Sequence, residues 1–234
     1  MTPDRPSPGS LVVGRPATGH LALGLVLFGL VLIGAAVFLV HPGPLGVDAV
    51  ILRELIATRT PGLTTVVDGL SRLFSPAAMC GWTALIVVAL VMRDRHLGRA
   101  LPVLAAAAAA AAAGTVVKVA VSRPRPPEVL QVGTPEATYS FPSGHVGGTT
   151  ALVVALLLVA GAGLPRLWHG LAALVAAAVI VVCAWTRLYL GVHWSSDVVG
   201  GALLGTSAAL LIPPIATYLL NRIANRFPVK GLRP

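Results

Sequence analysis

Six stretches of this chain are long and apolar enough to cross a membrane as helices, and they limit its fold more than any other feature. A helical span needs about 20 predominantly apolar residues. The stretches cover roughly residues 21–40, 76–92, 100–121, 144–162, 168–186 and 198–220. Charged residues make up only 11% of the chain, against about 25% in soluble domains, so the chain cannot cover itself against water. We therefore expect an all-α fold, a bundle of six transmembrane helices without a soluble domain.

The segment 41–75 differs from these stretches because it mixes charges with apolar residues at helical spacing, as in VDAVILRELIATRTPGLTTVVDGLSRLF. This pattern favours two short helices at the membrane interface, between the first and second spans and separated at Pro61. Residues 1–20 are rich in Pro and Gly, and we expect a disordered leader there, with a basic tail at 221–234. The first stretch has no A-x-A-like exit, which favours a membrane anchor over a cleaved signal peptide.

The distribution of Lys and Arg predicts the orientation of the chain in the membrane. The leader, the tail and the connections 93–99 and 163–167 hold ten basic and two acidic residues, whereas the other segments hold seven and six. Basic residues concentrate on the cytoplasmic side, so both termini should be cytoplasmic. The net charge of +9 then reflects topology, and we expect no nucleic-acid partner. Three polar clusters fall together on the outer side.

The first cluster, KVAVSRPRP, lies where the third stretch ends. Lys118 offers a point charge, Arg125 offers a planar fork that matches two phosphate oxygens, and the prolines stiffen the chain. This pattern indicates an anion site. A cation that reaches from a helix end toward the membrane surface would give the same pattern without any function.

The second cluster, FPSGHVGG, begins the fourth stretch. Pro142, Ser143 and Gly144 predict a turn that opens a helix, with His145 in its first turn. Unpaired N–H groups at a helix N-terminus bind anions, Gly144 lets a ligand approach the backbone, and Ser143 adds a hydroxyl. A serine hydrolase is disfavoured because there is no G-x-S-x-G elbow. A helix cap followed by an incidental histidine is the alternative.

The third cluster, RLYLGVHWSSD, follows twenty residues without Asp, Glu, Lys or Arg. His193 and Asp197 are four residues apart, so on a helix they share a face, and the carboxylate can fix the imidazole tautomer. A neutral, oriented imidazole is a nucleophile, and Asp197 would stabilise the charge that develops on attack. Arg187 can reach a phosphoryl oxygen. An interfacial histidine with a helix-capping aspartate is the alternative.

A metal site is a further alternative for these clusters. Two histidines and one aspartate could bind zinc, but the surrounding cations argue against a dication there. Cys80 and Cys183 both lie inside apolar stretches, so we expect neither a disulfide nor a metal site from them.

Together the clusters supply what phosphoryl transfer needs, which is a nucleophile, an acid and cations around the equatorial oxygens. Their motifs are Lys118, six residues and Arg125-Pro126, then Pro142-Ser143-Gly144-His145, then Arg187, five residues, His193, three residues and Asp197. This three-part signature resembles that of the type 2 phosphatidic acid phosphatase family, whose superfamily also contains the vanadium haloperoxidases. The resemblance implies that residues 21–220 form a six-span membrane phosphatase domain.

The resemblance also implies a role for each matched residue. His193 would form a phosphohistidine, oriented by Asp197, and His145 would protonate the leaving oxygen and later activate water. The phosphoryl oxygens would be held by Lys118, Arg125, Ser143, Gly144 and Arg187. No metal or other cofactor is expected. With one histidine neutral and the other protonated, we expect a bell-shaped pH–rate profile.

Two features depart from the signature or lie outside it. The third motif often begins Ser-Arg, whereas this chain has Thr186 before Arg187; a hydroxyl is kept, and we expect activity to be kept with it. Arg123 lies outside the signature, and we expect it to be a secondary contact.

We expect an integral phosphatase of the bacterial cell membrane whose site faces outward, toward the lipid headgroups. The Ala-, Gly- and Arg-rich composition suits a GC-rich bacterium, and undecaprenyl (polyprenyl) diphosphate is the substrate we rank first. Phosphatidylglycerophosphate and phosphatidic acid are alternatives, as is transfer of the phosphoryl group to a lipid or sugar acceptor. A non-enzymatic transporter or scaffold is disfavoured, because spans one, two, four and six lack charges in their apolar cores. The sequence does not indicate an oligomeric state.

Overall fold

The computed structural model describes residues 18–134, 136–161 and 163–226. The expected leader before Thr18 and the expected tail beyond Arg226 lie outside these ranges. The described residues form helices and connecting loops, with no strand among them. The helices are α1 (Thr18–Val40), α2 (Gly46–Ala57), α3 (Pro61–Arg72), α4 (Pro76–Asp94), α5 (Ala100–Val121), the 3₁₀ helix η1 (Glu128–Leu130), α6 (Gly144–Ala160), α7 (Arg166–Tyr189) and α8 (Ser195–Arg226).

Five helices of the described chain are long and apolar enough to cross a membrane. They are α1, α4, α5, α7 and the Ser195–Leu220 part of α8, and they coincide with five of the six expected stretches to within a few residues. The sixth stretch forms α6, which is apolar but has only 17 residues. At 1.5 Å per residue it is about 26 Å long, slightly less than a hydrocarbon core of about 30 Å. The number of six spans therefore stays a prediction.

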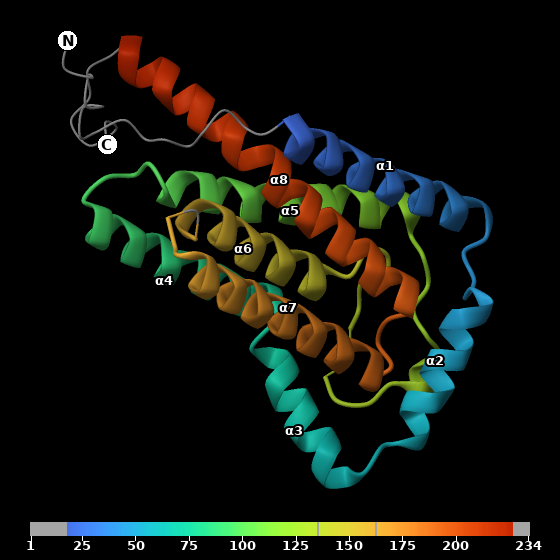
Figure 1. The fold of residues 1–234 in the computed structure, drawn as a ribbon. Helices are drawn as coiled ribbons and strands as arrows, with labels where there is room; N and C mark the ends of the chain where they lie inside the picture. Colours follow the sequence, from blue (N-terminus) through green and yellow to red (C-terminus); the bar gives the residue numbers. More distant parts are fainter. Residues whose placement is uncertain (1–17, 135, 162, 227–234) are drawn as a thin grey trace, which may run out of the picture.

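Helix α6 lies in the middle of the bundle, in contact with α5, α7 and α8 (Figure 1). Small residues allow the closest of these approaches. A Cβ atom added to Gly201 of α8 would lie 2.6 Å from the carbonyl oxygen of Ser143, and one added to Gly205 would lie 2.5 Å from that of Gly147. Contacts this short leave no room for a side chain. The two glycines therefore set how closely the start of α8 lies against the start of α6.

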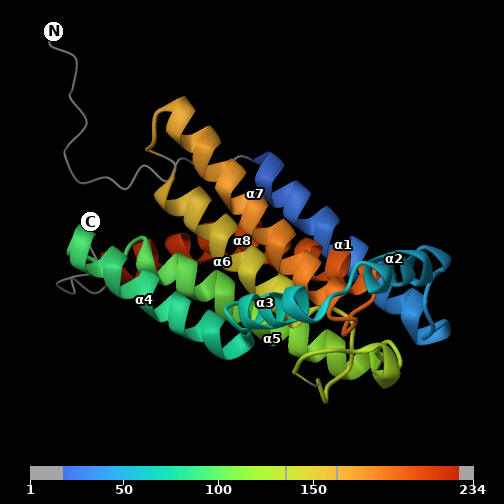
Figure 2. The ribbon, with the colours of Figure 1, turned by 90° about the horizontal axis from the view of Figure 1, so that it is seen from below.

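The two short helices expected in segment 41–75 are present as α2 and α3. Pro61 is the first residue of α3, where its missing N–H needs no partner, and the Thr60 hydroxyl caps the helix by accepting from the Leu63 N–H. Helix α2 contacts α7 and α8, and α3 contacts α7. Both lie across one end of the bundle, as the two views show (Figures 1 and 2).

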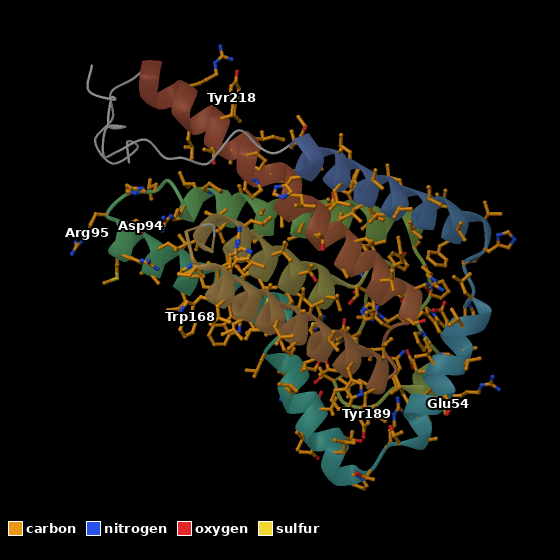
Figure 3. The ribbon with its side chains drawn as sticks, in the orientation of Figure 1. Glu54, Asp94, Arg95, Trp168, Tyr189 and Tyr218 are labelled. Carbon is orange, nitrogen blue, oxygen red and sulfur yellow. The ribbon has the colours of Figure 1, made fainter. Side chains whose placement is uncertain are left out.

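This covered end is where the expected polar clusters meet. Helices α5 and α7 end there, and α6 and α8 begin there (Figure 1). Figure 3 shows Tyr189, the last residue of α7, at this end, and Asp94 and Arg95 at the opposite end. Helix α1 begins and α8 ends on the side of Asp94 and Arg95 (Figures 1 and 3). The chain therefore enters and leaves the described bundle at the end away from the clusters.

Candidate active site

His193 and Asp197 form a deeply buried pair at this end, with 1% and 0% of their side chains exposed. The His193 Nδ1 atom lies 3.4 Å from Asp197 Oδ2. The spacing of four residues predicted that both side chains lie on one helix, but His193 precedes α8, which begins at Ser195. A turn brings the two side chains together, because Asp197 Oδ2 also accepts from the Trp194 N–H at 2.9 Å.

Arg125 determines the tautomer of this histidine. Its Nη1 atom lies 3.1 Å from His193 Nε2, and a guanidinium can only donate hydrogen bonds. Nε2 must therefore carry the lone pair, and the ring proton is on Nδ1, facing Asp197. Burial, followed by the nearby charges of Arg125, Arg187 and Lys118, lowers the pKa of His193 well below its ordinary value. The ring is thus neutral at physiological pH, with its nucleophilic nitrogen beside a cation.

The three expected phosphate-binding cations lie around the same space. Arg125 is held by the carbonyl oxygens of Thr138 and Val192, each at 2.5 Å. Lys118 donates to the Tyr139 carbonyl at 2.6 Å, and Arg125 Nη2 donates to that same oxygen at 3.3 Å. Backbone carbonyls thus hold two of the cations in place without neutralising their charge.

Arg187, at the end of α7, is held by α3 and by the loop before α6. Its Nη1 donates to the Ser71 hydroxyl at 2.5 Å, and its Nη2 donates to the Glu136 carboxylate. The side chain is only 4% exposed. The hydroxyl of the preceding Thr186 bonds to the Cys183 carbonyl of its own helix at 2.7 Å, so it faces the helix backbone.

Glu136 also belongs to this site, although no motif in the sequence predicted it. Its carboxylate accepts from Arg125 Nη2 at 3.0 Å and from Arg187, and it lies 3.8 Å from His145 Nε2. An anion therefore already sits among the cations expected to hold a phosphate. A sequence signal exists, because Glu136 is the only acidic residue between Glu128 and Asp197.

The start of α6 faces the same region. The Ser143 N–H donates to the Asp197 carbonyl at 3.0 Å, which ties the second motif to the third. A Cβ atom added to Gly144 would meet nothing within 4 Å, so the backbone there is open to a ligand. His145 is buried in the first turn of α6 and points its Nε2 toward Glu136. All eight expected site residues thus lie in one connected region.

Among the buried polar atoms of the described residues that have no hydrogen-bond partner, which include Arg123 Nε, two belong to the expected phosphate-binding residues. They are the Ser143 hydroxyl and Arg187 Nε. A buried donor without a partner costs about 1–3 kcal/mol, and both atoms belong to residues expected to hold a phosphoryl oxygen. A bound anion would satisfy them.

Arg123 does not lie where a secondary phosphate contact would be. It is fully buried, it bonds to the carboxylates of Asp48 and Asp197, and it packs 3.6 Å from the centre of the Phe38 ring. These partners lie on α1, α2 and α8, and they draw the guanidinium into the protein, behind the His193–Asp197 pair.

The chain matches a known protein family and is similar to several known proteins. The model of the PAP2 superfamily matches residues 99–220. Decaprenylphosphoryl-5-phosphoribose phosphatase of Mycolicibacterium smegmatis is 34% identical over 163 residues, which are 68% of this chain and 82% of that one. Undecaprenyl-diphosphatase of Sulfolobus acidocaldarius is 31% identical over 134 residues, which are 55% of this chain and 59% of that one.

A solved structure shares the fold. The crystal structure of the transmembrane PAP2 type phosphatidylglycerolphosphate phosphatase from Bacillus subtilis superposes with a TM-score of 0.68 at 23% identity, covering 87% of this chain and 96% of that one. The family model spans more than half of the chain. This chain therefore belongs to the PAP2 superfamily and is a multi-pass membrane phosphatase that acts on lipids.

Proposed function

We propose that this protein removes a phosphoryl group from a polyprenyl-linked phosphate at the outer leaflet, through a phosphohistidine on His193 and without a metal ion. The observation that carries the proposal is the position of the buried His193 ring, whose Nδ1 faces Asp197 and whose Nε2 faces Arg125.

In the first step His193 Nε2 attacks phosphorus, and the bond from phosphorus to the leaving oxygen breaks. His145 donates a proton to that oxygen, so the lipid leaves as a neutral alcohol or as a monophosphate. Lys118, Arg125, Arg187 and the Ser143 hydroxyl bind the other phosphoryl oxygens, whose charge they stabilise in the transition state. Asp197 stabilises the positive charge that the imidazole gains.

In the second step His145 takes a proton from water, and the water oxygen attacks phosphorus. The N–P bond breaks, inorganic phosphate leaves, and His193 is neutral again. The same intermediate could pass its phosphoryl group to an alcohol in place of water, which would make the protein a lipid phosphotransferase. Only the acceptor differs between these two outcomes.

The substrate ranked first is undecaprenyl diphosphate, in which the scissile group is bonded to a polyprenyl phosphate. The relative that is 31% identical is named for this activity. The mycobacterial relative favours a second candidate, a phosphate carried on the sugar of a polyprenyl-phosphoryl pentose. Both substrates present a terminal phosphoryl group to the cations and leave a polyprenyl chain in the bilayer. Phosphatidylglycerophosphate and phosphatidic acid are the non-prenyl alternatives.

We further propose that the site faces outward from the bacterial cell membrane, with both termini cytoplasmic. The bundle begins and ends away from the site (Figure 1), and the leader, the tail and the connections 93–99 and 163–167 together carry ten basic and two acidic residues.

The test measures phosphate release by the purified protein in detergent with excess EDTA. Wild type, His193→Gln and the matched control His41→Gln, at an exposed histidine just after α1, are each given the two polyprenyl substrates, phosphatidylglycerophosphate and phosphatidic acid. We expect release that resists EDTA, is lost in His193→Gln and is fastest on a polyprenyl substrate. Loss of wild-type activity in EDTA would contradict the metal-free mechanism. Lipid turnover without phosphate release would favour transfer to an acceptor.

A further inference from the structure

A buried line of alternating charges connects α2 to the nucleophile. Asp48 of α2 lies 3.0 Å from Arg123 Nη2, and Arg123 Nη1 lies 2.5 Å from Asp197 Oδ1. The other oxygen of Asp197 faces His193 at 3.4 Å. None of these four side chains is more than about 1% exposed, so solvent does not screen the charges from one another.

Asp48 has many partners for a residue outside every motif. Its Oδ1 accepts from the Ser195 hydroxyl at 2.6 Å and the Ser196 N–H at 2.8 Å, and its Oδ2 accepts from the Ser196 hydroxyl at 2.7 Å and the Leu45 N–H at 2.9 Å. Burial alone would raise the pKa of Asp48, but these hydrogen bonds outweigh it and hold the pKa below its ordinary value. Asp48 is therefore an anion. It belongs to α2 but contacts Ser195 and Ser196, the first residues of α8.

The formal charges along this line distinguish the resting enzyme from the intermediate. At rest Asp48, Arg123, Asp197 and neutral His193 sum to one negative charge. When His193 Nε2 bonds to phosphorus, the ring keeps its Nδ1 proton and becomes cationic, and the line becomes neutral with strictly alternating signs. In a low-dielectric interior, the balanced arrangement is favoured over one with an unpaired charge.

We propose that Asp48 and Arg123 are positioning residues for the reaction, which hold Asp197 and leave it enough negative charge to stabilise the cationic ring of His193. This inference rests on the phosphohistidine mechanism proposed above. Arg123 fixes the Asp197 carboxylate in space. Asp48 draws part of the charge of Arg123 toward itself, so that Asp197 is not fully neutralised by its arginine partner.

The test is Asp48→Asn, assayed for kcat, for KM and for phosphoenzyme by rapid acid-free quench. The variant leaves Arg123 paired with Asp197, so no lone buried charge remains to unfold the protein. We expect kcat and the rate of phosphoenzyme formation to fall by about tenfold or more, on the scale known for residues that orient a reacting group through a partner. KM should change by less than about twofold, because Asp48 lies behind the nucleophile and away from the phosphate.

Glu54→Gln is the matched control, because Glu54 is an exposed carboxylate on the same helix (Figure 3). It should behave as wild type. Arg123→Lys is the second variant: a lysine keeps the positive charge but cannot bridge the two carboxylates as a guanidinium does, and it should also lower kcat without raising KM. Gel filtration and inhibition by inorganic phosphate show whether each variant is folded with an intact anion site.

The possible outcomes separate this inference from the proposed function. Wild type that forms no alkali-stable, acid-labile phosphoenzyme would overturn the phosphohistidine mechanism itself. Wild type that forms it, together with folded Asp48→Asn that forms it at the wild-type rate, would overturn the positioning role alone. A rise in KM with kcat unchanged would also overturn it, because that result assigns Asp48 to binding.

Discussion

The Glu136 carboxylate and the Arg187 guanidinium are hydrogen-bonded across the site, between the loop before α6 and the end of α7. The same carboxylate bonds to Arg125. A substrate phosphate that uses these two arginines must therefore take donors from Glu136, so the carboxylate competes with the substrate for its cations.

Replacing Glu136 with glutamine should tighten the binding of inorganic phosphate as a competitive inhibitor. Removing the competing charge frees both arginines, and we expect the inhibition constant to fall by about fivefold to tenfold, where tenfold corresponds to about 1.4 kcal/mol. Glu128→Gln, at an exposed residue of η1, is the control and should not change it. Weaker inhibition in Glu136→Gln would show that the carboxylate supports the anion site.

The buried state of His193 predicts how stability depends on pH. Burial and neighbouring cations keep the pKa of folded His193 far below its ordinary value, whereas the unfolded chain binds a proton there near pH 6.5. The unfolded state therefore binds more protons below that pH, and stability falls as pH falls. The slope reaches at most about 1.36 kcal/mol per pH unit from this group.

Thermal unfolding in detergent at pH 7.5 and at pH 5 measures this effect. We expect a lower Tm at pH 5 and a smaller difference in His193→Gln, which cannot take up the proton. An equal difference in both proteins would assign the pH dependence to other groups.

Ser71 of α3 should matter for substrate binding although it lies outside every motif. Its hydroxyl holds Arg187 Nη1 at 2.5 Å, and the side chain is buried. Ser71→Ala removes this anchor, and since a hydrogen bond to a charged group contributes about 1.5–3 kcal/mol, we expect KM to rise by about threefold to tenfold with a smaller change in kcat. Thr65→Ala, on the exposed side of the same helix, is the control. Steady-state kinetics on the best substrate give KM and kcat for both variants and so test this prediction.

The orientation in the membrane can be tested by cysteine labelling. Val129 is 88% exposed at the site end of the bundle, and Arg95 lies at the other end (Figure 3). In a Cys80→Ser background, we expect Val129→Cys to react with a membrane-impermeant maleimide in intact cells, and Arg95→Cys to react only after the membrane is opened. The reverse pattern would place the site in the cytoplasm.

The sequence predicted the helices and the motif residues because each leaves a local signal. The length of an apolar stretch indicates a span. Because the chain crosses the membrane at each span, the topology predicted that the three clusters lie on the same side of the membrane. The short helices α2 and α3 were also predictable, since Pro61 separates two amphipathic stretches. Helix α6 differs because it has only 17 residues and lies in the middle of the bundle.

Residues that belong to none of the three motifs could not be predicted from the sequence in this way. Asp48 lies 75 positions before its partner Arg123, and Ser71 lies 116 positions before Arg187, so only tertiary packing brings them together. Arg123 was misplaced for the same reason, because its neighbour Arg125 faces the site while its own partners are on other helices. The placement of His193 before α8 follows from the bond between the Trp194 N–H and Asp197, which no helical periodicity reveals.

Helices α2 and α3 lie outside the stretch matched by the family model, yet they hold two arginines that lie inside it. The stretch matched by the family model is thus smaller than the unit that holds these two arginines in place. A chimera that transplants residues 99–220 into a related scaffold would carry Arg123 and Arg187 away from Asp48 and Ser71, leaving one guanidinium short of a carboxylate and the other short of a hydroxyl. Exchanges between relatives should therefore be cut before α2, where the segment and the arginines that depend on it travel together.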